Sequence, residues 1–363
     1  MRNRLLKTCV LLIFMHATFV VISCTTGPNT DDFLLKGSWN QEGLQHAEIN
    51  VIKEDEEGIL FGTDSGLLQW DEYAKEFYSL GLSDEQVIGV VKFNDGVFLV
   101  GTKASGFSSG DTTLFRLGHG ATNWDPFMNN FGGETGEYTF ISKGPLKRQN
   151  TSGTVWVRAG NAVARSDDKG NKWELISGNW GSWGGAAVLF YLDPFHQDNV
   201  WVGGVSALSQ ANLYNTTDRG STWTDVSAGL SDDIEAVAYD VISYPNNSNI
   251  ILTGLSGSVP EAFKIKKSTD MGKNWKTVNH EVGIHCFTHS AANSEIVYAS
   301  GRNSEGRLFF LASGDFGDTW QTIDHPESPT GIRVNDMVSV MEAGEEVLYL
   351  GTNKGVYSFI FDK

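Results

Sequence analysis

The chain has 363 residues, of which 27 are basic and 44 acidic, so its formal net charge is −17. A surface this acidic argues against nucleic acid and anionic lipid as partners, because both carry the same sign of charge. Three cysteines are too few for a disulfide framework or a cysteine-rich metal site.

The first 23 residues have the pattern of a secretory signal. Arg2, Arg4 and Lys7 precede an apolar run that ends at Ile22 and is too short for an ordinary membrane span. The run leads into Val-Ile-Ser-Cys24, which resembles a bacterial lipobox with cleavage before Cys24 and lipid on its sulfur. The alternative is an uncleaved anchor with an incidental cysteine. Cleavage leaves 24 basic against 44 acidic residues, a net charge of −20.

Residues 24–32 read as a short flexible tether, rich in Thr, Asp and Gly. By the same lipoprotein resemblance, Thr25 is not the aspartate that retains lipoproteins in the inner membrane. We therefore expect a protein anchored through Cys24 in the bacterial cell envelope, with the outer membrane favoured. Whether it faces the periplasm or the cell surface is left open.

From Asp32 onward, short β-branched or aromatic runs alternate with Gly, Asn and Asp turns, and no amphipathic helix is evident. The runs fall into seven similar groups, each of which predicts a four-stranded sheet. The expected second strands of these groups are Ile59–Thr63, Val97–Thr102, Thr154–Ala159, Asn199–Gly204, Ile250–Gly254, Glu295–Ser300 and Glu346–Thr352.

A repeated motif, Ser/Thr-x-Asp-x-Gly-x-x-Trp, follows the third strand of the third, fourth, fifth and sixth groups. Its aspartates are Asp168, Asp218, Asp270 and Asp315, separated by 50, 52 and 45 residues, as expected of propeller blades. The Asp carboxylate can accept backbone N–H groups of a hairpin turn, and the Gly supplies a positive φ. The Trp can begin the next strand and bury its ring against a neighbouring blade.

This motif resembles the Asp-box, or bacterial neuraminidase, repeat of sialidases, sortilin-like propellers, photosystem II stability-factor propellers and xyloglucan-hydrolysing propellers. The resemblance implies that each box closes the hairpin between the third and fourth strands, remote from the functional face. The residues that inherit this structural role are Asp168, Gly170, Trp173, Asp218, Gly220, Trp223, Asp270, Gly272, Trp275, Asp315, Gly317 and Trp320. The first two groups carry eroded copies of the box.

The two ends of the chain complement each other. The last strand, around Gly355–Phe361, has no box and no fourth strand after it, whereas Phe33–Trp39 looks like an isolated fourth strand. We therefore predict an all-β, seven-bladed β-propeller of four-stranded antiparallel blades over residues 33–363. Its N-terminal strand completes the last blade, which closes the ring and removes exposed sheet edges.

Functional residues are expected on the face opposite the boxes, in second-to-third-strand and blade-to-blade loops. For binding, two rings on a Gly-rich loop can stack on a sugar or on an apolar side chain, or instead cap a blade interior. The binding candidates are Trp180, Trp183, Asp232, Arg302, Arg333 and Asp336. For catalysis, paired carboxylates can hydrolyse glycosides, although a solvated acidic rim explains them as well. The catalytic candidates are Glu48, Asp233, Glu235 and His285.

Sialidases require an Arg-Ile-Pro segment near the N-terminus, and this chain has none. Xyloglucan hydrolases of the superfamily clasp their substrate between two propellers, whereas one is predicted here. His280, His285 and His289 share one segment but lie too far apart on a strand for a metal site, and we expect no metal or cofactor. The sequence thus favours a lipid-anchored, non-catalytic module that binds a protein or a glycan, with a glycan-active hydrolase as the alternative.

Overall fold

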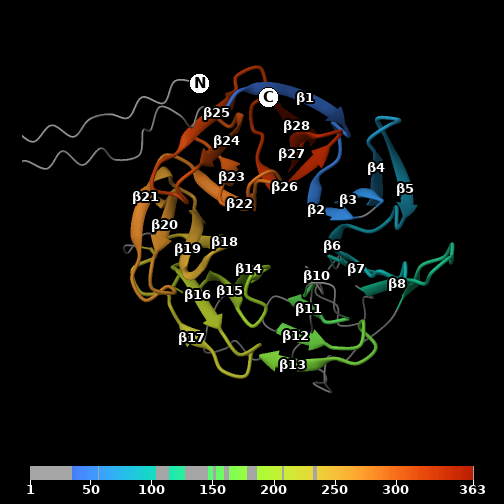
Figure 1. The fold of residues 1–363 in the computed structure, drawn as a ribbon, viewed down its shortest axis with the longest axis horizontal. Coiled ribbons are helices and arrows are strands. Elements are labelled where there is room, and N and C mark those ends of the chain that lie inside the picture. The colour runs from blue at the N-terminus through green and yellow to red at the C-terminus, as the bar shows by residue number, and fades with distance from the viewer. Residues whose placement is uncertain are drawn as a thin grey trace, which may run out of the picture. The chain divides into compact units, whose positions relative to one another are not determined.

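The structure, a computed structural model, describes residues 35–55, 57–103, 114–126, 146–149, 153–158, 163–177, 186–206, 208–231 and 235–362. Within these ranges, seven four-stranded antiparallel sheets are arranged as blades around a common axis (Figure 1). They belong to one compact unit, Leu35–Lys363. The predicted seven-bladed propeller is therefore confirmed. The signal, Cys24 and the tether lie outside the described residues.

Each blade runs from an innermost to an outermost strand. The innermost strands are β2 (Ile49–Asp55), β6 (Val87–Lys92), β10 (Leu146–Arg148), β14 (Ala186–Leu192), β18 (Val237–Tyr244), β22 (Gly283–His289) and β26 (Val334–Glu342). The second strands, all overlapping the predicted ones, are β3 (Gly58–Thr63), β7 (Phe98–Thr102), β11 (Val155–Arg158), β15 (Val200–Val205), β19 (Asn247–Ser256), β23 (Val297–Arg302) and β27 (Glu345–Thr352).

The third strands are β4 (Gly66–Asp71), β8 (Leu114–Leu117), β12 (Val163–Ser166), β16 (Ala211–Thr216), β20 (Lys264–Ser268), β24 (Leu308–Ser313) and β28 (Gly355–Phe361). The outermost strands are β5 (Glu76–Gly81), β9 (Asp125–Pro126), β13 (Glu174–Ser177), β17 (Thr224–Asp225), β21 (Lys276–Asn279), β25 (Gln321–His325) and β1 (Gly37–Gly43). Among the described residues, the helical structure is one 3-10 turn, η3 (Pro260–Ala262).

The hydrophobic core lies in layers between adjacent blades. One cluster joins side chains of the second, third and fourth blades, and another joins the fourth and fifth. The indoles of Trp156 and Trp201, on the second strands of neighbouring blades, are both 0% exposed. Because each sheet buries both faces against its neighbours, the blades are stable only as a ring.

The N-terminal strand closes that ring, as predicted. β1 pairs antiparallel with β28, from Gly37 opposite Phe361 to Gly43 opposite Val356, and becomes the outermost strand of the seventh blade (Figure 1). The ring of Trp39 packs edge-on against Phe310 and Phe359. First and last strands of the propeller therefore share one sheet.

Tryptophans at the outer strands of three blades donate a hydrogen bond to the blade before. The indole Nε1 of Trp39 donates to the carbonyl of Asp324, at 3.1 Å, on the outer strand of the preceding blade. Trp275 donates in the same way to Val226, at 2.9 Å. Trp124, in an eroded copy of the motif, donates to Leu80 at 2.7 Å. The hydrogen bond between blades thus survives where the rest of the motif is lost.

The four complete motifs form one repeated turn between the third and fourth strands. In each, the Asp Oδ1 accepts the backbone N–H of the residue four positions later, at 2.7 to 2.8 Å. The Ser or Thr hydroxyl donates to the same carboxylate, at 2.7 to 2.9 Å, and accepts the N–H of the Gly. These contacts satisfy the polar groups of the turn from within the motif.

Glycine is required in this turn for two reasons. Its φ is positive in all four copies, and so is that of the residue before it, which the sequence did not suggest. In addition, a Cβ at Gly170 would meet Leu99 of the second blade at 2.8 Å, and one at Gly317 would meet Leu252 of the fifth at 2.7 Å. The turn therefore packs directly on the preceding blade.

Removing one of these carboxylates should destabilise the propeller. Asp315→Ala removes the hydrogen bonds from Ser313, Asp318 and Thr319. The expected loss in free energy of unfolding is about 1 kcal/mol. Urea unfolding at pH 7 measures it, with Asp84→Ala, at an exposed carboxylate between the first two blades, as control.

The same contacts predict an acid limb of stability. The hydroxyl and the backbone N–H of Thr222, followed by the hydroxyl of Thr216, lower the pKa of Asp218 to about 2. A depressed carboxyl pKa stabilises the fold above the unfolded value of 3.8, and this stabilisation is lost as the pH falls toward 2.

For the Asp315→Ala variant above, unfolding equal to that of the parent protein at pH 7 would contradict the structural role of the motif.

Candidate functional site

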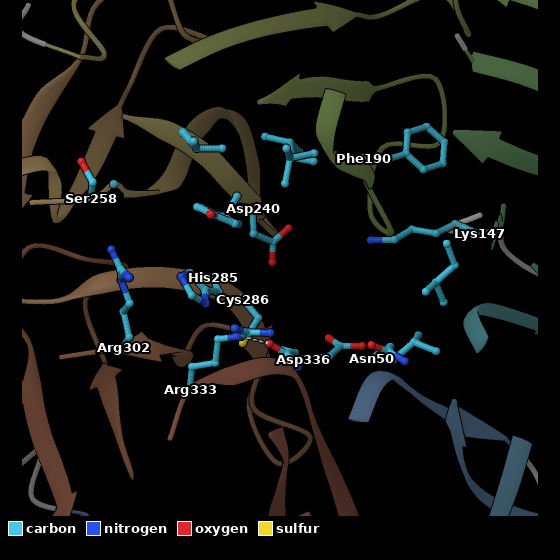
Figure 2. Close-up of a pocket in the computed structure, with 18 residues that line it drawn as sticks. Asn50, Lys147, Phe190, Asp240, Ser258, His285, Cys286, Arg302, Arg333 and Asp336 are labelled. Carbon is cyan, nitrogen blue, oxygen red and sulfur yellow. Dashed lines mark hydrogen bonds between the residues drawn. The ribbon is translucent and has the colours of Figure 1, made fainter. Parts of the chain in front are cut away.

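A pocket of about 690 Å³ opens at the centre of the ring, on the face opposite the repeated turns. Residues from the innermost strands of all seven blades line it, from Asn50 of β2 around to Asp336 of β26. Figure 2 shows His285 and Arg302 on one side, Lys147 reaching in from the other, and the carboxylates of Asp240 and Asp336 between them. This channel mouth is where every blade contributes side chains to one space.

A register shift in the innermost strands aims these side chains into the channel. Six of the seven pair with their second strands through a shift at the same point of the blade. Such a bulge leaves one residue without a cross-strand partner and redirects its side chain. The six bulge residues, all of which line the pocket, are Asn50, Ile88, Val188, Tyr239, His285 and Asn335.

The residue after the bulge is an aspartate in two blades, where it joins that blade to the next. Asp240 accepts the N–H of Val241 at 2.9 Å and, across the blade boundary, that of Phe287 at 2.8 Å. Asp336 accepts the N–H of Met337 at 2.9 Å and that of Ile52 in the first blade at 2.8 Å. The two carboxylates thus occupy equivalent positions and make equivalent contacts.

Both carboxylates have perturbed acidity. Burial raises the pKa of Asp240 to about 6, against the opposing attraction of Lys147 and the hydrogen bonds of Phe287 and Val241. Burial likewise raises the pKa of Asp336, although the N–H of Ile52 and Lys147 act in the other direction. Such shifts are common at functional sites, but structural hydrogen bonding also occurs with them.

His285 is held as a neutral imidazole. Its Nδ1 lies 3.2 Å from the carbonyl oxygen of Val334, which can only accept, so Nδ1 carries the proton and Nε2 is an acceptor. Its ring stacks at a tilt on Tyr239, with centroids 4.4 Å apart. Burial, together with the charges of Arg302 and Arg333, lowers its pKa to about 4.

Three cations line the pocket, and they differ in their partners. Arg333 pairs with Glu48 and donates from Nε to Asn335 at 2.9 Å. Lys147 belongs to β10 of the third blade. Its positive charge acts to lower the pKa values of Asp240 and Asp336, against the larger raising effect of burial. Arg302 makes no ion pair with any residue that the structure describes, and its guanidinium lies over the ring of Phe263, 5.0 Å from the centroid.

The predicted site residues are partly brought together. His285, Arg302, Arg333 and Asp336 line the channel mouth, as expected of residues on that face. Glu48 lies beside it and is engaged by Arg333, and Glu235 is exposed outside the lining. Neither Glu48 nor Glu235 is among the residues that line the pocket. Trp180, Trp183, Asp232 and Asp233 lie outside the described residues.

Sequence reasoning missed Lys147, Tyr239 and Asp240. The sequence did contain a sign of the bulge. Inward-packed apolar residues of an innermost strand are two positions apart along the regular strand but three positions apart across the bulge. Ala238 and Val241 show this spacing, as do Val334 and Met337, and all four are buried. Aligning these steps would have placed Asp240 and Asp336 at one position.

A second pocket, of about 790 Å³, lies between the turns of the seventh and first blades on the repeat face. Exposed Tyr73, Tyr78 and Met341 border it. Its lining includes the carboxylates Glu54, Asp55, Glu57, Asp71, Glu72 and Glu342, and no lysine or arginine. The two pockets therefore differ in charge, with cations gathered at the channel mouth.

The described ranges contain no group of three or more His, Cys, Asp or Glu side chains placed to hold a metal ion. In the same part of the chain, no helix has the length and apolar character needed to cross a membrane. Cys286 lines the pocket as a free, buried thiol whose pKa burial raises.

No protein-family model and no curated protein matches the sequence. Solved structures match the fold at 11 to 16% sequence identity, which establishes the propeller alone. The extracellular domain of the BT4673 two-component system protein of B. thetaiotaomicron is 13% identical, with a TM-score of 0.63 over 90% of this chain. The GH74 xyloglucanase of Xanthomonas campestris is 14% identical, with a TM-score of 0.66 over 89%.

YCF48 of Cyanidioschyzon merolae is 11% identical, with a TM-score of 0.62 over 89% of this chain, and a YCF48 bound to D1 peptide also matches. The chain spans 98% of the length of that algal protein. It spans only 40% of the BT4673 domain and 53% of the xyloglucanase.

The surroundings of His285 predict its titration. In an NMR titration its imidazole should protonate near pH 4, and Arg302→Ala should raise that pKa, because it removes a repelling charge. Lys354→Ala, at a front-face lysine outside the pocket lining, is the control. Because the unfolded state protonates first, near pH 6.5, His285 should lower stability progressively as the pH falls from 6.5 to 4. A midpoint near 6.5 would show that His285 is not enclosed as described.

Proposed function

We propose that this protein is a non-catalytic binding module of the bacterial cell envelope, which holds a ligand at the channel mouth of its propeller. The observation that carries the proposal is the pocket itself, to which all seven blades contribute and in which cations remain available. Concave sites with a few convergent polar groups are the usual location of ligand binding.

The contacts of the pocket carboxylates favour binding over hydrolysis. Asp240 and Asp336 each use both oxygens to accept backbone N–H groups, one of them from the next blade. A paired-carboxylate hydrolase needs one carboxyl free to give a proton and the other free to attack or to activate water. Here the two carboxylates serve first to join blades.

Protein ligands occur among the structural neighbours. A YCF48 is solved with a D1 peptide, and a chain of the mitotic checkpoint complex also matches, with a TM-score of 0.62. We propose a protein ligand here as well, and a glycan is tested as the other arm of the experiment below.

The proposed anchor is lipid on Cys24, preceded by a cleaved signal over residues 1–23 and followed by a tether to residue 32. The chain enters the propeller on the repeat face, because Leu35 exchanges two hydrogen bonds with Gln321, which directly follows the repeated motif. The channel mouth opens on the opposite face. The bacterial neighbour of extracellular location, BT4673, is in keeping with an envelope address.

A glycan-active hydrolase is the second candidate, favoured by one observation. Asp240 lines the pocket with a pKa raised to about 6, which suits a general acid near neutral pH. The xyloglucanase neighbour shares the fold.

Binding is tested by applying the full chain, in mild detergent, to a peptide array and a glycan array together with an activity screen. We expect capture of peptides without turnover of any glycan, and a reduced signal for Arg302→Ala but not for Tyr73→Ala on the repeat face. Glycan hydrolysis that Asp240→Asn abolishes would replace the proposal with the hydrolase. Equal signals from the parent and Arg302→Ala would remove the channel mouth as the binding site.

Lipidation is tested by metabolic labelling with a radioactive fatty acid in a bacterial host. The parent chain should incorporate label and fractionate with membranes, whereas Cys24→Ser should do neither, because the thioether cannot form. Cys9→Ser is the matched control within the same segment. Equal labelling of Cys24→Ser and the parent would contradict the lipoprotein assignment.

A further inference from the structure

Arg302 is placed to offer its charge to a ligand. It ends β23, opposite Gly283 of β22, and its guanidinium is supported by the ring of Phe263, 5.0 Å away. Its Nε is buried without a hydrogen-bond partner, and none of the described acidic residues pairs with it. Arg302 therefore lines the pocket of a chain of net charge −17 without a carboxylate partner among the described residues. Guanidinium groups favour planar, bidentate anions such as carboxylates.

His285, near Arg302, offers a hydrogen-bond acceptor, whereas Arg302 offers only donors. The neutral His285 donates from Nδ1 to Val334, so that its Nε2 is an acceptor in a residue that lines the pocket. A ligand that fits both residues must carry an anion and, near it, an N–H or O–H donor. A peptide has both, in a carboxylate and its backbone amides.

Exposed apolar side chains border the same side of the mouth. Val259, in the loop between β19 and β20, is 41% exposed, and Leu208, in the loop between β15 and β16, is 80% exposed. Both loops lie on the face of the propeller that carries the channel mouth. The segment before β18 contacts both loops: the N–H of Ala236 donates to the carbonyl of Ser209 at 3.0 Å, and a Cβ at Gly257 would meet the carbonyl oxygen of Glu235 at 2.6 Å. Val259 directly follows Ser258 of the pocket lining. Apolar residues of a ligand can therefore pack beside the anion site.

The aromatic rings of the pocket are already covered, which disfavours a neutral glycan. Of the aromatic rings that line the pocket, Phe190 is 3% exposed, and Tyr239 has one face covered by His285. Phe263, beside the lining, is 5% exposed and lies under Arg302. Sugars bind by laying a ring face on an exposed aromatic face, and little such surface is offered here.

We infer that the channel mouth binds a peptide segment of a partner protein through a carboxylate that pairs with Arg302, a backbone amide that donates to Nε2 of His285, and apolar neighbours on Val259 and Leu208. The inference rests on the proposed binding function and names its ligand class. Arg333 is not the anchor, because Glu48 and Asn335 already engage it.

The test uses synthetic hexapeptides in matched pairs that differ only by Glu or Gln, each made as the free acid and as the C-terminal amide. They are applied as an array to the full chain in mild detergent, and the strongest pair is then measured by fluorescence anisotropy. Carboxylate peptides should bind at least tenfold more tightly than their neutral partners. The amide series shows whether a side chain or the chain end supplies the carboxylate, and either source supports the inference.

Variants locate the effect at Arg302. Arg302→Ala should abolish the tenfold preference for carboxylate, and Arg302→Lys should retain part of it, because charge remains without the planar fork. Lys354→Ala, which removes a front-face cation outside the pocket lining, should change nothing. Thermal unfolding of each variant confirms that the fold is kept.

Four results would overturn the inference. Equal binding of Glu and Gln peptides, or an Arg302→Ala variant with the preference intact, would remove the carboxylate site while the binding function stands. Capture of acidic glycans in place of peptides would likewise keep the proposed binding function but replace the peptide ligand with a glycan. Absence of binding on both arrays would overturn the inference and the proposed function together.

Discussion

The pairing of β1 with β28 is the contact on which the whole molecule depends. Each blade buries its faces against two neighbours, so an open seventh blade would expose apolar surface and an unpaired strand edge at one point of the ring. β1 covers that edge, and Trp39 adds a hydrogen bond to Asp324 of the preceding blade and edge-on contacts with Phe310 and Phe359. Because the closing strand comes from the opposite end of the chain, separation of the ends costs the packing of two blade boundaries at once.

Closure also fixes the geometry of the channel. The innermost strands are held around one axis, and six of them bulge at the same level, so that each sends one side chain inward. Asp240 and Asp336 follow directly after two of the bulges and reach across to backbone N–H groups of the next blade. The distortion that forms the pocket is therefore stabilised by the residues beside it.

The propeller architecture could be predicted from the sequence because the motifs that specify it are local and repeated. Each Ser/Thr-x-Asp-x-Gly-x-x-Trp copy satisfies its own polar groups, so its residues determine the turn wherever it occurs. The closing fourth strand, predicted at Phe33–Trp39, followed from counting strands, and β1 confirms the closure with a strand over Gly37–Gly43. The pocket was less accessible, since a one-residue bulge reverses the face on which later side chains point. Asp240 would be assigned to the wrong face by strict alternation, and Lys147 depends on the juxtaposition of blades far apart in sequence.

The charge of the pocket follows from how the fold uses its carboxylates. Asp240 and Asp336 accept N–H groups of neighbouring blades, and Glu48 holds Arg333 beside Asn335. Each of these acids is committed to a blade boundary, so none is left to neutralise Arg302. The second pocket, with six carboxylates and no lysine or arginine in its lining, shows that acidic side chains are abundant elsewhere on the same propeller. Arg302 thus has no carboxylate partner among the described residues because the nearby anions are engaged in holding the ring together, and the polarity of the proposed ligand follows from the same contacts that stabilise the fold.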